Sequence, residues 1–214
     1  MVLLTDKDRV PSMLRFTIAM FVRADSKFTS GTLFGYSVEQ NIGETILLYF
    51  SSLQIHLQVK DKVISADSTI ADDKWHFVAG VWNGETGVAS LYFDGVEIGT
   101  EHNILKGSLM LGGGWISLGK RYLAAQKKAD PSTSFSGILH QVNVWSTAAQ
   151  PDHMWLAAQS CAWPIPGSLK GWTDFLFGLK RKSGEKIQIG LQRYVKIRIC
   201  KSASRRQPRY IKLR

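Results

Sequence analysis

The chain has 214 residues, of which 44% are apolar and 11% aromatic, enough to build one domain with a full core. No run of about 18 apolar residues occurs, which argues against a membrane-spanning helix. The net charge of +10 is uneven, because residues 180–214 hold thirteen Lys and Arg and one acid. That segment carries +12, which leaves −2 for residues 1–179. The asymmetry predicts a nearly neutral body at 1–179 and a basic extension at 180–214.

Strand patterns fill the body. Residues 53–60 alternate between apolar and polar side chains, as in a strand with one buried face, whereas residues 75–83 are nearly all apolar. Asn and Gly residues at 83–87 predict a chain reversal. The predicted strands are 16–23, 31–36, 45–50, 53–60, 63–64, 75–82, 88–93 and 135–145. With a surface loop at 120–134 and one short helix at 151–159, they predict an all-β, antiparallel two-sheet sandwich.

The basic extension contains two kinds of sequence. Residues 186–200 alternate apolar and polar side chains, which predicts a half-buried strand, and residues 202–214 are basic and predicted to be disordered. Three interpretations stay open: a solvated tail, a polyanion-binding arm, and a terminus that the native protein lacks. Cys161 and Cys200 are too few for a disulfide-dense scaffold, and one bridge or two free thiols both fit the sequence.

Three segments together resemble one known family. They are FTIAMFVR at 16–23, the hairpin WHFVAGVWNGETGVASLYFDGVEIG at 75–99, and FSGILHQVNVWS at 135–146, which a short helix and Cys161 follow. Over about residues 12–178, their order resembles the pentraxin-like domains of the concanavalin A-like lectin and laminin-G superfamily. The resemblance implies a jelly-roll sandwich and a non-enzymatic extracellular module for recognition or adhesion, with a carbohydrate, glycan or protein ligand.

The start of the chain shows no signal peptide. If the protein is secreted, as the resemblance implies, we expect an incomplete N-terminus or a fragment of a larger protein. The oligomeric state cannot be predicted from the sequence, although family pentraxins often form rings.

Two departures from the family carry information. The resemblance places a disulfide between two core strands at positions that here are Ala19 and Ala79, so the fold must rely on packing. Pentraxins also bind calcium through an acidic cluster that follows a Leu-Gly pair. Here Leu118-Gly119 is followed by Lys120-Arg121-Tyr122-Leu123, and only Gln40, Asn41 and Glu44 remain near the other ligand loop. Because calcium takes about six to eight oxygen ligands, we expect the family's calcium site to be lost and no cofactor to bind.

Basic and aromatic residues are the remaining candidates for binding. The candidate anion-binding residues are Lys120, Arg121, Lys127 and Lys128 in the loop and Arg205, Arg206 and Arg209 in the extension. They suit a sulfated glycan, a phosphate group or nucleic acid, and the loop residues also fit a merely solvated surface. Trp115 and Tyr122 are candidates for stacking on a sugar, with packing of the hairpin as the alternative.

Catalytic signatures are missing from the sequence. Asp94 and Glu97 are the best local pair of acids for a glycosidase, but Asp94 falls in a turn, and we interpret the pair as turn and edge residues. No motif for nucleophilic, zinc or phosphate chemistry occurs. His76 lies in a Trp-His strand and is predicted to pack rather than to bind a metal. We therefore predict no enzymatic activity.

Overall fold

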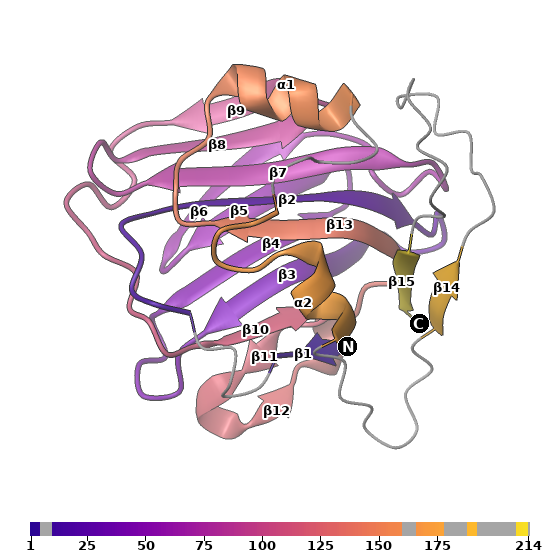
Figure 1. Cartoon of the computed structure of the whole chain (residues 1–214), viewed down its shortest axis with the longest axis horizontal. Helices are drawn as coiled ribbons and strands as arrows, with labels where there is room; N and C mark the ends of the chain where they lie inside the picture. The colour runs from indigo at the N-terminus through magenta and orange to yellow at the C-terminus, as the bar shows by residue number, and fades with distance from the viewer. Residues whose placement is uncertain (5–9, 160–165, 178–187, 192–208, 214) are drawn as a thin grey trace.

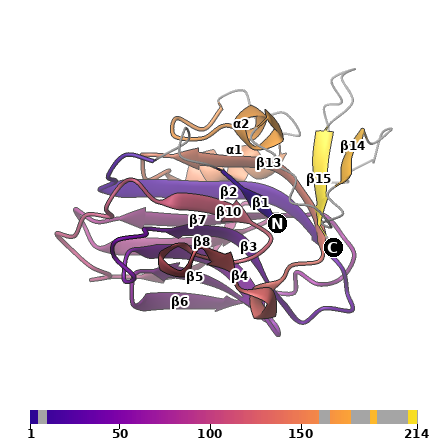
Figure 2. The same cartoon turned by 90° about the horizontal axis from the view of Figure 1, so that it is seen from below.

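The computed structural model describes residues 1–4, 10–159, 166–177, 188–191 and 209–213 (Figure 1). Two antiparallel sheets are stacked face to face, as the view in Figure 2 shows. One sheet has the order β1 (Val2–Leu3), β10 (Trp115–Leu118), β3 (Ser30–Ser37), β4 (Thr45–Ser51), β5 (Gln54–Val59) and β6 (Lys62–Asp67). The other has the order β14 (Gln188–Leu191), β15 (Arg209–Leu213), β13 (Gly137–Trp145), β2 (Arg15–Ala24), β7 (His76–Asn83), β8 (Val88–Phe93) and β9 (Val96–Glu101).

Strand β2 shows how the sequence builds this core. Its side chains alternate between faces, so Ile18 and Met20 enter the core between the sheets, while Ala19 and Phe21 face the opposite side. That opposite side is covered by helix α1 (Pro151–Gln159), whose Met154, Ala157 and Ala158 pack in the same cluster. Both faces of the strand are therefore buried, as the apolar pattern of residues 16–23 predicts.

The hairpin of β8 and β9 closes with a two-residue turn. Phe93 pairs with Val96, and the two residues between them, Asp94 and Gly95, have φ angles of +49° and +87°. Both angles are positive, as in the type I′ turn that Asp-Gly favours. The predicted Asp94-Gly95 turn is present, although strand β9 itself was not predicted.

Two features differ from the sequence expectation in the body. The predicted loop at 120–134 contains a small hairpin of β11 (Tyr122–Leu123) and β12 (Lys128–Ala129), with 3-10 turns at Ala124–Gln126 and Pro131–Thr133. A second short helix, α2 (Trp172–Phe177), joins the single predicted one. Its six residues are too few to show helical periodicity. Tertiary contacts hold it, since the Trp172 N–H donates to Asn143 Oδ1 at 3.2 Å and Phe175 is fully buried.

The end of the chain forms a strand where disorder was predicted. The disordered tail predicted at 202–214 is wrong for residues 209–213, which form β15 and pair with β13. Ile211 and Leu213 are 0% and 2% exposed and belong to the main core. The alternation is only five residues long and lies in a basic run, so the sequence pattern did not reveal it. Of the strand predicted at 186–200, the structure describes β14 alone.

Some sequence predictions cannot be compared with the structure. Cys161 and Cys200, whose pairing the sequence left open, lie outside the described residues, and so does most of the basic extension. Within the described residues, none of the helices combines the length and the apolar composition that crossing a membrane requires.

Candidate functional site

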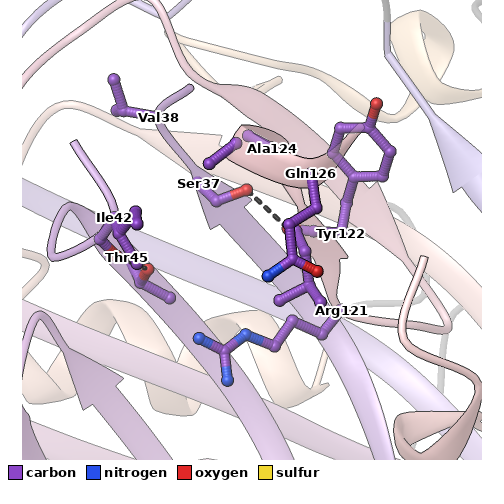
Figure 3. Close-up of a pocket in the computed structure, with 10 residues that line it drawn as sticks. Ser37, Val38, Ile42, Thr45, Arg121, Tyr122, Ala124 and Gln126 are labelled. Atoms are coloured by element: carbon purple, nitrogen blue, oxygen red, sulfur yellow. Dashed lines mark hydrogen bonds between the residues drawn. The ribbon is translucent and has the colours of Figure 1, made fainter. Parts of the chain in front are cut away.

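A pocket opens where the β11–β12 hairpin meets the loop between β3 and β4 (Figure 3). It is small, with a cavity volume of about 40 Å³, and it is partly open to solvent. Its lining comes from two segments that are about 80 residues apart in the sequence. The lining includes Ser37, Ile42, Thr45, Arg121, Ala124 and Gln126.

Hydrogen bonds to the backbone fix both walls of this pocket. Ser37 Oγ donates to the Tyr122 carbonyl at 2.6 Å, which ties β3 to the hairpin. The Arg121 N–H donates to Thr133 Oγ1 at 2.9 Å, and the Arg121 carbonyl accepts from the Asp130 N–H at 2.9 Å. Both backbone polar groups of Arg121 are therefore hydrogen-bonded, which fixes the position of its Cα and the base of its side chain.

The Arg121 side chain is the charged group of the pocket lining. Its guanidinium extends past the side chain of Gln126 in the close-up (Figure 3). The Nε atom is buried and lacks a hydrogen-bond partner. The pKa of Asp130 is lowered mainly by its hydrogen bond from Ser132, and to a smaller extent by the charges of Arg121 and Lys128. Asp130 is therefore a nearby anion, and its Oδ1 accepts a hydrogen bond from Ser132 Oγ at 2.6 Å.

The other predicted basic residues are placed differently. Lys127 Nζ lies 2.9 Å from Glu39 Oε1, so its charge is balanced at the surface. Lys120 is partly exposed, and Lys128 is exposed on β12. Of the four loop cations, the structure thus brings Arg121 into the pocket lining. Arg205 and Arg206 lie outside the described residues, and Arg209 belongs to β15, where its side chain is not described.

The two candidate stacking residues pack against each other. The ring centroids of Trp115 and Tyr122 are 5.8 Å apart, and Tyr122 is 7% exposed. Met1 and Ala124 complete this small cluster. Stacking on a sugar requires an exposed ring face, which Tyr122 does not offer here. The arrangement is the hairpin packing that the sequence analysis gave as the alternative.

Glu44, an acid at the end of the loop between β3 and β4, has other partners. Its carboxylate lies 2.8 Å from Lys60 Nζ and also accepts from the Leu111 N–H at 2.8 Å. The residue is 5% exposed and does not line the pocket. In the part of the chain that the structure describes, no three or more His, Cys, Asp or Glu side chains form a group that could hold a metal ion.

The two acids considered for a glycosidase are each held by neighbouring strands. Asp94 accepts from the Phe77 N–H at 2.8 Å and lies 2.9 Å from His76 Nδ1, while Glu97 accepts from Tyr92 Oη at 2.8 Å. These partners are consistent with the turn and edge interpretation.

Sequence reasoning did not find Ser37, Ile42 or Ala124 as parts of a site. Their residue types are common in strands and turns, and no spacing in the sequence links the β3–β4 loop to the β11–β12 hairpin. The pairing of β3 with β10, which precedes the hairpin, and the hydrogen bond from Ser37 to the Tyr122 carbonyl bring the two segments together.

Comparison with known proteins identifies the family. The profile of the concanavalin A-like lectin/glucanases superfamily matches residues 2–154. The chain belongs to this superfamily. Within it, the domain is pentraxin-like: human neuronal pentraxin-2 is 27% identical over 168 residues, which are 78% of this chain and 39% of that protein. The chain thus spans about two fifths of the length of this relative.

Solved structures agree with the pentraxin-like fold. The native heptameric SAP-like pentraxin from Limulus polyphemus matches with a TM-score of 0.70 at 22% identity, covering 81% of this chain and 82% of that one. The CBM40 of the Ruminococcus gnavus IT-sialidase, solved with α2,3 sialyllactose, matches with a TM-score of 0.54 at 13% identity, covering 68% and 83%. At these identities the likeness shows the fold alone. The predicted jelly-roll sandwich of pentraxin type is confirmed.

Proposed function

We propose that this pentraxin-like domain is a non-enzymatic extracellular recognition module that binds a glycan or protein ligand without calcium. The observation that carries the proposal is Arg121, a cation in the pocket lining at the position where the family resemblance places an acidic cluster. Lectin-like relatives and carbohydrate-binding neighbours of the same fold support a binding role.

The donors around the pocket do not fit a calcium ion. Calcium is bound by about six to eight oxygen atoms, usually from several carboxylates. Here the Arg121 guanidinium would repel the ion, and the carboxylates of Glu44 and Glu39 already bind Lys60 and Lys127. Freeing Glu44 would leave Lys60 without its anion and the Leu111 N–H without its acceptor. Any ligand must therefore contact protein groups directly.

Thermal unfolding of the full chain tests the proposal. We expect the same midpoint in millimolar calcium chloride, in magnesium chloride of equal ionic strength, and in a chelator, because ligands stabilise only the state that they bind. The variant Arg121→Glu is the matched comparison, since it removes the cation and adds a carboxylate at the same place. A calcium-specific rise in the midpoint of the unmodified chain would contradict calcium-independent binding.

The second candidate is polyanion binding through the basic loop and the extension. The charge of +12 on residues 180–214 favours it. The pairing of Lys127 with Glu39 reduces the contribution expected from the loop. This candidate therefore depends mainly on the extension.

A further inference from the structure

Arg121 is a partly enclosed cation that forms no ion pair with any carboxylate of the described residues. Its Nε is buried without a hydrogen-bond partner, and among the described residues no carboxylate forms an ion pair with its guanidinium. The charge of Arg121 contributes to the lowered pKa of Asp130. The Asp130 carboxylate accepts a hydrogen bond from Ser132 and forms no ion pair with the Arg121 guanidinium. A buried N–H without an acceptor destabilises a folded protein, so packing alone does not account for this residue. A negatively charged group from outside the domain would supply the missing partner.

The surroundings of Arg121 favour one kind of anion. A guanidinium presents its N–H groups as a planar fork, which matches the two oxygens of a carboxylate. Apolar side chains provide most of the remaining lining, and Ile42 at the rim is 78% exposed. An aliphatic group beside the carboxylate would cover this exposed surface.

Two hydroxyls of the pocket are already engaged, which leaves the Gln126 amide and the Arg121 guanidinium as its polar side chains open to a ligand. The Ser37 hydroxyl donates to the Tyr122 carbonyl, and the Thr45 hydroxyl donates to the Ile42 carbonyl at 3.3 Å (Figure 3). A sugar acid would bring several hydroxyls that need partners here. We infer that the Arg121 pocket receives a carboxylate on a short aliphatic arm, as at the C-terminus of a protein ligand that ends in an aliphatic residue. The inference rests on the proposed recognition function and names the ligand class.

Nuclear magnetic resonance titration of the full chain tests this inference. The probes are butyrate, its neutral isostere butyramide, a short peptide ending in valine with a free carboxylate, and the same peptide as an amide. N-acetylneuraminic acid represents a glycan ligand. We expect butyrate and the peptide acid to shift resonances of the pocket, and the two amides to leave them unchanged.

Substitutions at Arg121 supply the second part of the test. Arg121→Met should weaken binding of the peptide acid by roughly 10- to 100-fold. It should also raise the thermal midpoint of the free chain, because the buried Nε–H without an acceptor is gone. Lys106→Met, which removes an exposed lysine elsewhere, is the matched control and should change neither quantity. Arg121→Lys, which keeps the charge and loses the planar fork, should bind more weakly than the unmodified chain.

Three results would overturn the inference: no response to either carboxylate, binding of N-acetylneuraminic acid in place of the peptide acid, or equal effects of Arg121→Met and Lys106→Met. Each would leave the calcium measurement intact, because the result that contradicts calcium-independent binding is read from the unmodified chain without an organic ligand. Failure of carboxylate binding is thus distinguishable from failure of calcium-independent recognition.

Discussion

His76 lies between two carboxylates at the beginning of β7. Its Nδ1 is 2.9 Å from Asp94 Oδ2, and its Nε2 is 3.1 Å from Asp72 Oδ1. The ring also stacks on Phe93, with centroids 4.5 Å apart. Burial disfavours the charged imidazole, but the hydrogen bonds and charges of Asp94 and Asp72 outweigh burial and raise the pKa of His76. The protonated ring therefore stabilises the folded state more than the neutral ring does.

This arrangement makes the stability of the domain depend on pH. A raised folded pKa gives stability that is complete below the unfolded pKa of about 6.5 and is lost as the pH rises through the folded pKa. We expect His76→Gln to lower the free energy of unfolding by about 1 kcal/mol more near pH 5.5 than near pH 8. Urea unfolding at the two pH values measures the difference. His153→Gln, at an exposed position on α1, is the control, and an equal loss at both pH values would speak against a charged His76.

The sequence allowed part of this residue-level detail to be predicted. A packed His76 and a turn at Asp94 follow from local patterns. The Asp72–His76–Asp94 group does not, because Asp94 reaches His76 through the pairing of β7 with β8, in which Val78 lies opposite Phe93. Contacts that depend on strand register are not encoded in any short stretch of sequence.

Among the elements, β2 and β7 form the pair that the family resemblance links by a disulfide. The register places Ala19 directly opposite Ala79, and the two residues are 2% and 0% exposed. Opposed residues in antiparallel strands have Cα atoms about 4.5–5.5 Å apart, within the range that a disulfide spans. The resemblance thus identified two positions that the fold brings together.

Restoring the bridge should stabilise the domain. The double variant Ala19→Cys, Ala79→Cys is expected to oxidise to one disulfide and to raise the free energy of unfolding by about 2–4 kcal/mol, because the bridge restricts the unfolded chain. Unfolding with and without reductant, together with a thiol assay, measures both effects. The single variants are the controls and should not respond to reductant through this site. Two reactive thiols in the oxidised double variant would show that the positions are not in register.

Strand β15 joins the basic extension to the body. Ile211→Ala should lower the free energy of unfolding by about 2–4 kcal/mol, because Ile211 is fully buried in the main core. The neighbouring Lys212→Ala changes a partly exposed residue of the same strand and should stay within about 0.5 kcal/mol. Urea unfolding of the two variants compares them directly. Equal stability would mean that the strand does not contribute to the core.

For the molecule as a whole, the sequence predicted the long strands of the sandwich well and its short strands poorly. Long apolar or alternating runs, such as residues 16–23 and 75–82, became β2 and β7 within one or two residues of the expected bounds. Strands β11, β12 and β15 are too short to show a sequence pattern: β11 and β12, of two residues each, pair with each other, and β15, of five residues, pairs with the long strand β13. The pocket follows the same rule. Arg121 was a candidate by residue type, but its enclosure depends on how the hairpin folds against β3.

The distribution of charge gives the whole-molecule prediction. Residues 180–214 carry +12 and residues 1–179 carry −2, so a polyanion such as heparin should bind through the extension. Truncation is a poor test, because it would also delete β15 and its core residues. Replacing Arg205 and Arg206 by Gln removes two charges outside the described residues and keeps the strand. We expect the variant to bind heparin more weakly and to show a salt dependence of log Kd that is shallower by about 2.

A charge-matched control distinguishes heparin binding by the extension from a general effect of the protein's net charge. Lys62→Gln with Lys106→Gln removes two exposed charges from the body, whose net charge is already −2, and should leave heparin affinity nearly unchanged. Affinity measured over a range of salt concentrations compares the two double variants with the unmodified chain. Equal losses in both would mean that heparin responds to net charge and not to the extension. In that case Arg121 and its pocket would be left as the candidate recognition site of the domain.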